Sequence, residues 1–246
     1  MSVFLEICCG SIDDAIQAQA GGAERVELCS ALFLGGLTPS IGTMQHARHQ
    51  LRIPICAMVR PRGGGFCYTD AEFATMERDA EALVANGADA LVFGILNADG
   101  EVDLVRTRRL REIAGSKHSV FHRAFDVTPD PFRALDQLVD LGITRILTSG
   151  QQDTVPEGAD LIRRLIEHAR DRIEILPGGG IKPFNLADVI ARTGCKQVHL
   201  TAFKSVADRS THRNPSVTFG GALQPPEDQF LMTDPALVAQ IVNKLK

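Results

Sequence analysis

Short apolar segments alternate with amphipathic segments along almost the whole chain. The apolar segments are rich in Val, Ile and Leu, which is typical of buried strands in a parallel sheet. The segments that follow them repeat their apolar residues at helical spacing. This alternation predicts parallel strands joined by right-handed helical crossovers. The predicted strands cover residues 3–8, 25–29, 53–60, 90–95, 118–122, 145–148, 173–176 and 197–200.

Capping and turn residues mark the ends of the predicted helices. Ser11 is a plausible N-cap for the first helix, and the pair Gly21-Gly22 ends it. Asp130 and Pro131 open a later helix, because proline is tolerated in the first helical turn. The predicted helices cover 12–20, the stretch from the 34–40 loop to about 50, 70–86, 103–114, 131–141, 156–169, 185–193 and the chain from 235 onward.

Eight strand–helix units in 246 residues predict a single-domain TIM (β/α)8 barrel that spans residues 1–246. A long polar segment, 203–233, is expected to form a loop before the last helix. The alternative is an open, doubly wound sheet. It is less favoured because Cys8-Cys9-Gly10-Ser11, and not a GxGxxG motif, follows the first strand.

Charge and composition argue against nucleic-acid and membrane partners. The net charge of −4 argues against a nucleic-acid partner. No apolar run reaches the length of a membrane span, and Glu6 interrupts the only apolar stretch near the start, so neither a membrane partner nor a signal peptide is expected. The expected location is therefore the cytoplasm, where the six scattered cysteines would be thiols. Barrels often self-associate, which leaves a homo-oligomer open.

Ionisable residues follow the fifth predicted strand. Val120 and Phe121 lead directly into His122 and Arg123, and Asp126 comes three residues later. Because TIM-barrel active sites lie at the carboxyl ends of the strands, His122, Arg123 and Asp126 are candidate catalytic residues. The alternative interpretation is a structural ion pair beside a hydrogen-bonded core histidine.

Two carboxylates interrupt apolar strands. Glu6 lies inside the first predicted strand and Glu27 inside the second. A buried carboxylate is costly unless it is paired, and Arg60, Arg62 and Arg123 are candidate partners. Glu6 and Glu27 are therefore either catalytic residues or members of a polar network that fills the barrel.

Arginines and glycines near the predicted mouth point to an anion. Arg60 and Arg62 follow the third strand, and Ser149 follows the sixth. Gly178, Gly179 and Gly180 follow the seventh strand, where barrels often bind phosphate through backbone N–H groups. These six residues form the predicted anion site, although a glycine run is equally typical of a tight turn.

Two cysteines end neighbouring strands. Cys8 ends the first predicted strand and Cys29 the second. Adjacent strands lie roughly 5 Å apart, so the two thiols could share one soft metal ion such as Cu(I) or Zn. Because buried cysteine often only fills core space, that alternative stays open.

Motifs along nearly the whole chain resemble those of the CutC family. They are Leu5-Glu6-Ile7-Cys8, Gly21-Gly22-Ala23, Arg25-Val26-Glu27-Leu28-Cys29, Gly35-Gly36-Leu37-Thr38-Pro39-Ser40, Arg60-Pro61-Arg62-Gly63-Gly64, Phe121-His122-Arg123-Ala124-Phe125-Asp126, Leu147-Thr148-Ser149-Gly150, Pro177-Gly178-Gly179-Gly180-Ile181 and Arg213-Asn214-Pro215. The resemblance implies a cytoplasmic TIM barrel with a role in copper homeostasis and with Cys8 and Cys29 as Cu(I) ligands. Gly65 stands where the family usually has Asp.

Two hypotheses follow. The first is a copper homeostasis protein that binds Cu(I) through Cys8 and Cys29. The second is a barrel enzyme that acts on an anionic small molecule, phosphorylated molecules included. In that case His122 or a strand carboxylate is the general acid or base, and the 203–233 segment closes over the mouth as a lid.

Overall fold

Eight parallel strands form the centre of the protein in the computed structural model, which describes residues 3–220 and 227–246. Each strand pairs with its neighbours in the order β7-β6-β5-β4-β3-β2-β1-β8. A parallel bridge between Gly178 and His199 joins the two ends of this sheet and closes it. The predicted TIM barrel is therefore confirmed. The strands are β1 (Phe4–Cys9), β2 (Arg25–Leu28), β3 (Ile55–Met58), β4 (Ala90–Phe93), β5 (His118–Phe121), β6 (Arg145–Thr148), β7 (Glu174–Pro177) and β8 (Gln197–Leu200).

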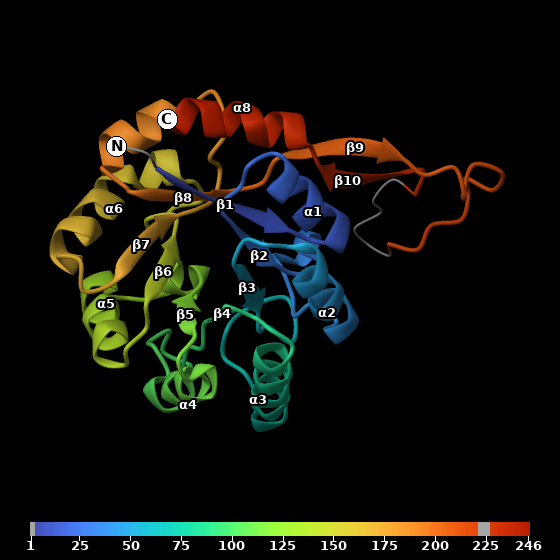
Figure 1. Ribbon diagram of the computed structural model, residues 1–246. Helices are drawn as coiled ribbons and strands as arrows, with labels where there is room; N and C mark the ends of the chain where they lie inside the picture. Colours follow the sequence, from blue (N-terminus) through green and yellow to red (C-terminus); the bar gives the residue numbers. More distant parts are fainter. Residues whose placement is uncertain (1–2, 221–226) are drawn as a thin grey trace.

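Helices surround the strands (Figure 1). They begin where the capping residues predict: the Ser11 side chain accepts the N–H of Asp14, and Asp130 accepts N–H groups at the start of α5. The helices are α1 (Ile12–Ala20), α2 (Ile41–Gln50), α3 (Asp70–Ala85), α4 (Leu104–Ala114), α5 (Pro131–Asp140), α6 (Val155–Ala169), α7 (Leu186–Thr193) and α8 (Pro235–Leu245), with short 3₁₀ turns η1 (Leu32–Leu34) and η2 (Arg123–Val127). Among the described residues, none of these helices has the length and apolarity that a membrane crossing requires.

The segment between β8 and α8 contains two strands that the sequence did not predict. β9 (Phe203–Ala207) and β10 (Gln229–Thr233) pair antiparallel, and Figure 1 shows this ribbon projecting beyond the barrel. The segment 203–233 therefore begins with β9 and ends with β10, which are the two strands of one hairpin. Backbone pairing supplies the order here because most residues of the two strands are exposed and give no apolar pattern. The part of the predicted loop at 221–226 lies outside the described residues.

Alternate residues of each strand face opposite sides of the barrel wall. In β1, Leu5, Ile7 and Cys9 belong to the apolar layer between strands and helices. Cys8 belongs to a second, interior cluster that includes Cys29 and Cys56. The period of two therefore places Cys8 inside the barrel and its neighbour Cys9 outside, which fixes the thiol that can take part in chemistry at the mouth.

Candidate functional site

A cavity of about 660 Å³ lies at the carboxyl ends of the strands. The mouth cavity has an apolar wall that includes Leu32, Met58 and Leu147. Several ionisable groups that lie in the barrel strands or directly after them line the same space, as expected for a TIM barrel. They are Cys8, Glu27, Arg60, His122, Arg123, Asp126 and His199.

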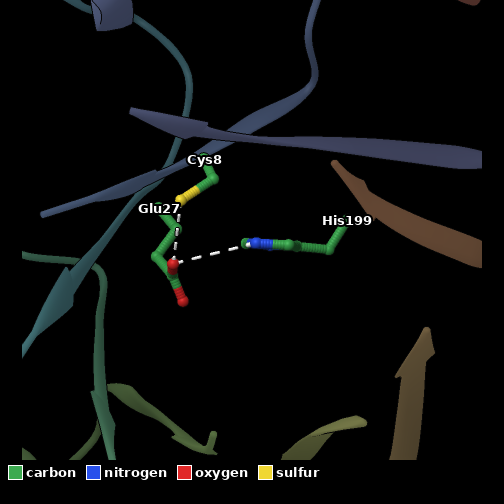
Figure 2. Close-up of side chains that lie close together, drawn as sticks. All are labelled: Cys8, Glu27 and His199. Carbon is green, nitrogen blue, oxygen red and sulfur yellow. Dashed lines mark hydrogen bonds and ion pairs between the residues drawn. The ribbon is translucent and has the colours of Figure 1, made fainter. Parts of the chain in front are cut away.

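Three buried side chains of different chemistry meet at the base of this cavity (Figure 2). The Sγ of Cys8 lies 3.4 Å from Oε2 of Glu27, and Nε2 of His199 lies 3.8 Å from the same oxygen. The three residues come from β1, β2 and β8, which are neighbours in the barrel. Strand register explains the first contact, because Cys8 and Glu27 are direct partners in the β1–β2 pair.

A second thiol contacts the same oxygen of Glu27. The Sγ of Cys29 lies 3.5 Å from Oε2 of Glu27, and the side chain is buried. The buried Glu6 accepts a hydrogen bond from Nδ1 of His199 at 2.7 Å and pairs with Arg25. We call Cys8, Glu27, Cys29 and His199 the thiol–carboxylate cluster.

Burial and neighbouring charges shift the pKa values in this cluster in opposite directions. The Cys29 thiol and the His199 imidazole outweigh burial and lower the pKa of Cys8 to about 5. Burial and the nearby Cys8 sulfur raise the pKa of Glu27 to about 8. The pKa of Cys29 is raised well above its usual value, because its thiol donates a hydrogen bond to the Cys8 sulfur and burial opposes ionisation. Near neutral pH the cluster therefore favours a Cys8 thiolate, a protonated Glu27 and a Cys29 thiol.

The charge of His199 completes this arrangement. Burial opposes the imidazolium, but Glu27, Cys8 and Glu6 surround the ring and raise its pKa well above the usual value. Burial likewise opposes ionisation of Glu6, yet Arg25 and His199 hold its pKa well below the usual range. The result is a thiolate–imidazolium pair, which is the form in which cysteine acts as a nucleophile or as a metal ligand.

The donor atoms of the cluster fit a soft or borderline metal ion. Thiolate and imidazole ligands suit Cu(I) and Zn, whereas a carboxylate is a poor ligand for Cu(I). Cys8 and His199 supply such donor atoms within 4.8 Å of each other, and Cys29 lies beside the same Glu27 oxygen. Because the raised pKa keeps Glu27 protonated near neutral pH, its carboxyl places no negative charge there. The chemistry of these residues is therefore compatible with a metal centre.

His122 lies on the other side of the mouth cavity. It follows β5 and begins η2, and its Nδ1 accepts the backbone N–H of Ala124 at 3.1 Å. Burial and the nearby Arg60 lower the pKa of His122 to about 3, so the ring is neutral at physiological pH. The ring packs against Gly94, where an added Cβ would lie 2.4 Å from Nδ1. A permanently neutral imidazole is suited to donating a hydrogen bond rather than to cycling a proton.

The carboxylate of Asp126 is saturated by its neighbours. It accepts the N–H of Ser149 at 3.0 Å, the hydroxyl of Ser149 at 2.9 Å and the N–H of Gln151 at 3.2 Å. Arg123 Nε donates to it at 2.8 Å, and the Thr148 hydroxyl also donates. We call Arg123, Asp126, Thr148, Ser149 and Gln151 the Asp126 cluster. Its N–H and O–H groups, those of Ser149 included, donate to the chain's own carboxylate.

The other five residues of the predicted anion site make different contacts. Arg60 lines the cavity, and Arg62 instead pairs with Glu72, with 2.6 Å between Nε and Oε1. The N–H of Gly178 donates to the carbonyl of Thr148. Gly179 and Gly180 both have a positive φ, as a tight turn between β7 and α7 requires. The structure thus brings Arg60 to the mouth and uses the glycine run as a turn.

Known proteins resemble this chain over most of its length. A model of the CutC family matches residues 3–204. A CutC family protein of Treponema denticola is 49% identical and covers 99% of both chains. The chain belongs to the CutC family. The human copper homeostasis protein cutC homolog is 42% identical over 94% of this chain and 85% of its own length.

Solved structures extend the comparison to the fold. The CutC structure from Streptococcus agalactiae is 39% identical, with a TM-score of 0.77, and covers 81% of this chain and 98% of its own. A phosphoribosylanthranilate isomerase from Thermotoga maritima is only 13% identical, with a TM-score of 0.55, over 99% of this chain and 98% of its own. The second similarity shows the barrel fold alone.

Sequence reasoning placed Cys8, Cys29 and Glu27 at strand ends but did not join them to His199. The strand 197–200 contains a histidine between apolar residues, and that was the available signal. The pairing needs barrel closure, since His199 and Glu6 are 193 residues apart. In this CutC chain the candidate metal site therefore needs the last barrel strand, β8, in addition to β1 and β2.

Proposed function

We propose that this CutC protein binds Cu(I) through Cys8 and Cys29, with His199 as a further ligand. The observation that carries the proposal is the meeting of two thiols and one imidazole at a single oxygen of Glu27. Soft sulfur ligands favour Cu(I) over the harder divalent ions. The names of the human relative and of its mouse counterpart refer to copper homeostasis, which supports the choice of metal.

The protein's own residues would prepare the site for a metal. Cys8 is poised to supply a thiolate, while Cys29 and His199 must each lose a proton when they bind the metal. The Glu27 carboxyl contacts both sulfurs and, because it is protonated near neutral pH, adds no negative charge beside the thiolates. All six cysteines are free, which is consistent with a protein that works in the reducing cytoplasm.

An anaerobic titration of Cu(I) against a competing chelator tests this proposal. We expect tight, stoichiometric binding in the wild type and a loss of at least about 100-fold in affinity in Cys8→Ser or Cys29→Ser, since each variant removes one soft ligand. Cys9→Ser is the matched control, because Cys9 is the adjacent buried thiol on the outer face of β1. Equal binding by all four proteins, or tighter binding of Zn²⁺ than of Cu(I), would contradict the proposal.

A second candidate function is an enzyme that acts on an anionic small molecule. The specific observation in its favour is that the mouth cavity has a volume of about 660 Å³ and is lined by His122 and Arg60 as well as by Cys8 and His199. A metal carrier does not need such a space. In this function the Cys8–His199 pair would be the reactive group, as a nucleophile or as an acid and base.

A further inference from the structure

Two buried N–H groups in the wall of the mouth cavity lack a hydrogen-bond acceptor among the described residues. One is Nε2 of His122 and the other is Nε of Arg60. His122 is 4% exposed and Arg60 is 6% exposed, and both line the cavity. Because an unsatisfied buried donor costs about 1–3 kcal/mol, such groups usually indicate a partner that binds there.

The hydrogen-bonding pattern of His122 determines which ring nitrogen donates. Nδ1 accepts the N–H of Ala124, so the proton of the neutral ring is on Nε2. The low pKa of His122 keeps the ring neutral. Nε2 is therefore a fixed donor throughout the physiological pH range.

Arg60 adds a buried positive charge with no carboxylate opposite it. Its Nη1 donates to the carbonyls of Leu34 and Gly36, and its Nη2 donates to the carbonyl of Gly64. Among residues 3–220 and 227–246, no carboxylate oxygen lies within ion-pairing distance of this guanidinium. The three carbonyls fix the side chain but leave its charge uncompensated, which favours an anion at the free Nε.

Phe66 lies against both donors. Its ring centre is 5.0 Å from that of His122 and 5.2 Å from the central carbon of the Arg60 guanidinium. The unpaired nitrogens are shielded from solvent in this arrangement. A ligand would reach them by displacing the Phe66 ring, which follows three consecutive glycines at 63–65 and is only partly buried.

We propose that Arg60 and His122 bind the carboxylate of a small organic acid whose apolar part occupies the mouth cavity beside Leu32, Met58 and Leu147. This inference deepens the second candidate function and does not depend on copper binding. One cation and two N–H donors match a monoanionic carboxylate. A phosphate dianion needs more donors, and the nearby Ser149 and Gly178 N–H groups are already engaged.

Phenylacetate and its neutral analogue phenylacetamide test the proposal on the intact protein, with inorganic phosphate as a third probe. We expect phenylacetate to bind with a Kd on the order of 1 mM or lower and phenylacetamide to bind at least about tenfold more weakly. In ¹⁵N-labelled protein, phenylacetate should shift the Nε2–H resonance of His122. Arg60→Met should weaken phenylacetate about tenfold or more. Arg108→Met, which removes an exposed arginine of α4, should leave its affinity unchanged.

Different failures lead to different conclusions. Phenylacetate binding that leaves the His122 resonance unmoved and survives Arg60→Met would overturn this assignment while keeping an anion site at the mouth. Equal binding of the acid and the amide would overturn the carboxylate class, as would phosphate binding more tightly than phenylacetate. No binding of any probe to the wild type would overturn both this inference and the second candidate function. Because the wild-type resonance and the acid–amide comparison need no variant, misfolding of Arg60→Met leaves the test valid.

Discussion

The thiol–carboxylate cluster and the Asp126 cluster lie at the same end of the barrel but satisfy their charges differently. Asp126 accepts hydrogen bonds from two hydroxyls, two backbone N–H groups and Arg123. Glu27 instead has two sulfurs and one imidazole nitrogen at 3.4–3.8 Å from one oxygen. One carboxylate is fully paired and fixed. The other remains free to exchange a proton.

The comparison indicates which of the two groups of residues is the better candidate for chemistry. The His122-Arg123-Asp126 motif is the more conspicuous in the sequence, yet two of its three residues hold the β5–β6 connection together. The less conspicuous Cys8 and Glu27 have pKa values shifted toward neutrality, which is typical of functional groups. A carboxylate whose oxygens accept several hydrogen bonds, such as Asp126, thus indicates a structural role. Groups with long contacts and shifted pKa values, such as Glu27 and Cys8, are the candidates for reactivity.

The largest expected effect comes from removing the saturated carboxylate. Asp126→Ala leaves the Ser149 and Gln151 N–H groups and the Thr148 hydroxyl without their acceptor. We expect the free energy of unfolding to fall by about 2–4 kcal/mol. Urea unfolding measures this loss. Asp153→Ala, an exposed carboxylate in the next loop, is the control and should change stability by less than about 0.5 kcal/mol. A stability loss no larger than that of the control would mean that Asp126 is not the structural group of the pair.

A smaller effect tests the reactive side of the comparison. Cys8 owes its low pKa partly to His199, so His199→Asn should raise that pKa toward the ordinary value of about 8.5. Near pH 6, alkylation of Cys8 by iodoacetamide should slow roughly 100-fold, because only the thiolate reacts. Mass spectrometry identifies the modified cysteine. The control is His118→Asn at the exposed start of β5. If both variants react at the wild-type rate, His199 does not activate Cys8.

The smallest expected effect is a difference in how stability depends on pH. The folded-state pKa of Glu27 is raised to about 8, so between about pH 4.5 and pH 8 the folded state holds a proton that the unfolded state has released. Its contribution to stability is therefore lost as pH rises through this range. Glu27→Gln removes that loss, and we expect a gain of about 1–3 kcal/mol near pH 7 that shrinks toward pH 5.

Glu6→Gln is the matched control with the opposite sign. The pKa of Glu6 is held low by Arg25 and His199, so its stabilisation is present above the usual carboxyl pKa and is lost only as pH falls below it. Glu6→Gln should therefore be less stable than the wild type near neutral pH, and the difference should shrink in acid. Urea unfolding of both variants across pH provides the measurement. Parallel pH profiles for the two variants would show that Glu6 and Glu27 do not differ in protonation.

Local patterns were sufficient for most of the fold. Apolar runs and helix caps located the eight barrel strands and eight helices, because the strands are buried on both faces and the helices bury one face at helical spacing. The predicted strand at 53–60 was too long, since the structure limits β3 to Ile55–Met58. The hairpin β9–β10 was not predicted, because its order comes from pairing between strands more than 20 residues apart in sequence rather than from a local apolar pattern.

The local apolar pattern is sufficient to place Cys8 and Glu27 near the mouth of a barrel, because strand periodicity and parallel strand order follow from residues close in sequence. Which of these groups share protons and hydrogen bonds depends on the folded chain. Barrel closure brings His199 to Glu6 and Glu27, and loop packing delivers Asp126 to Ser149. The physical reason is that protonation and hydrogen bonding depend on burial and on charges a few ångströms away, and residues far apart in sequence supply both.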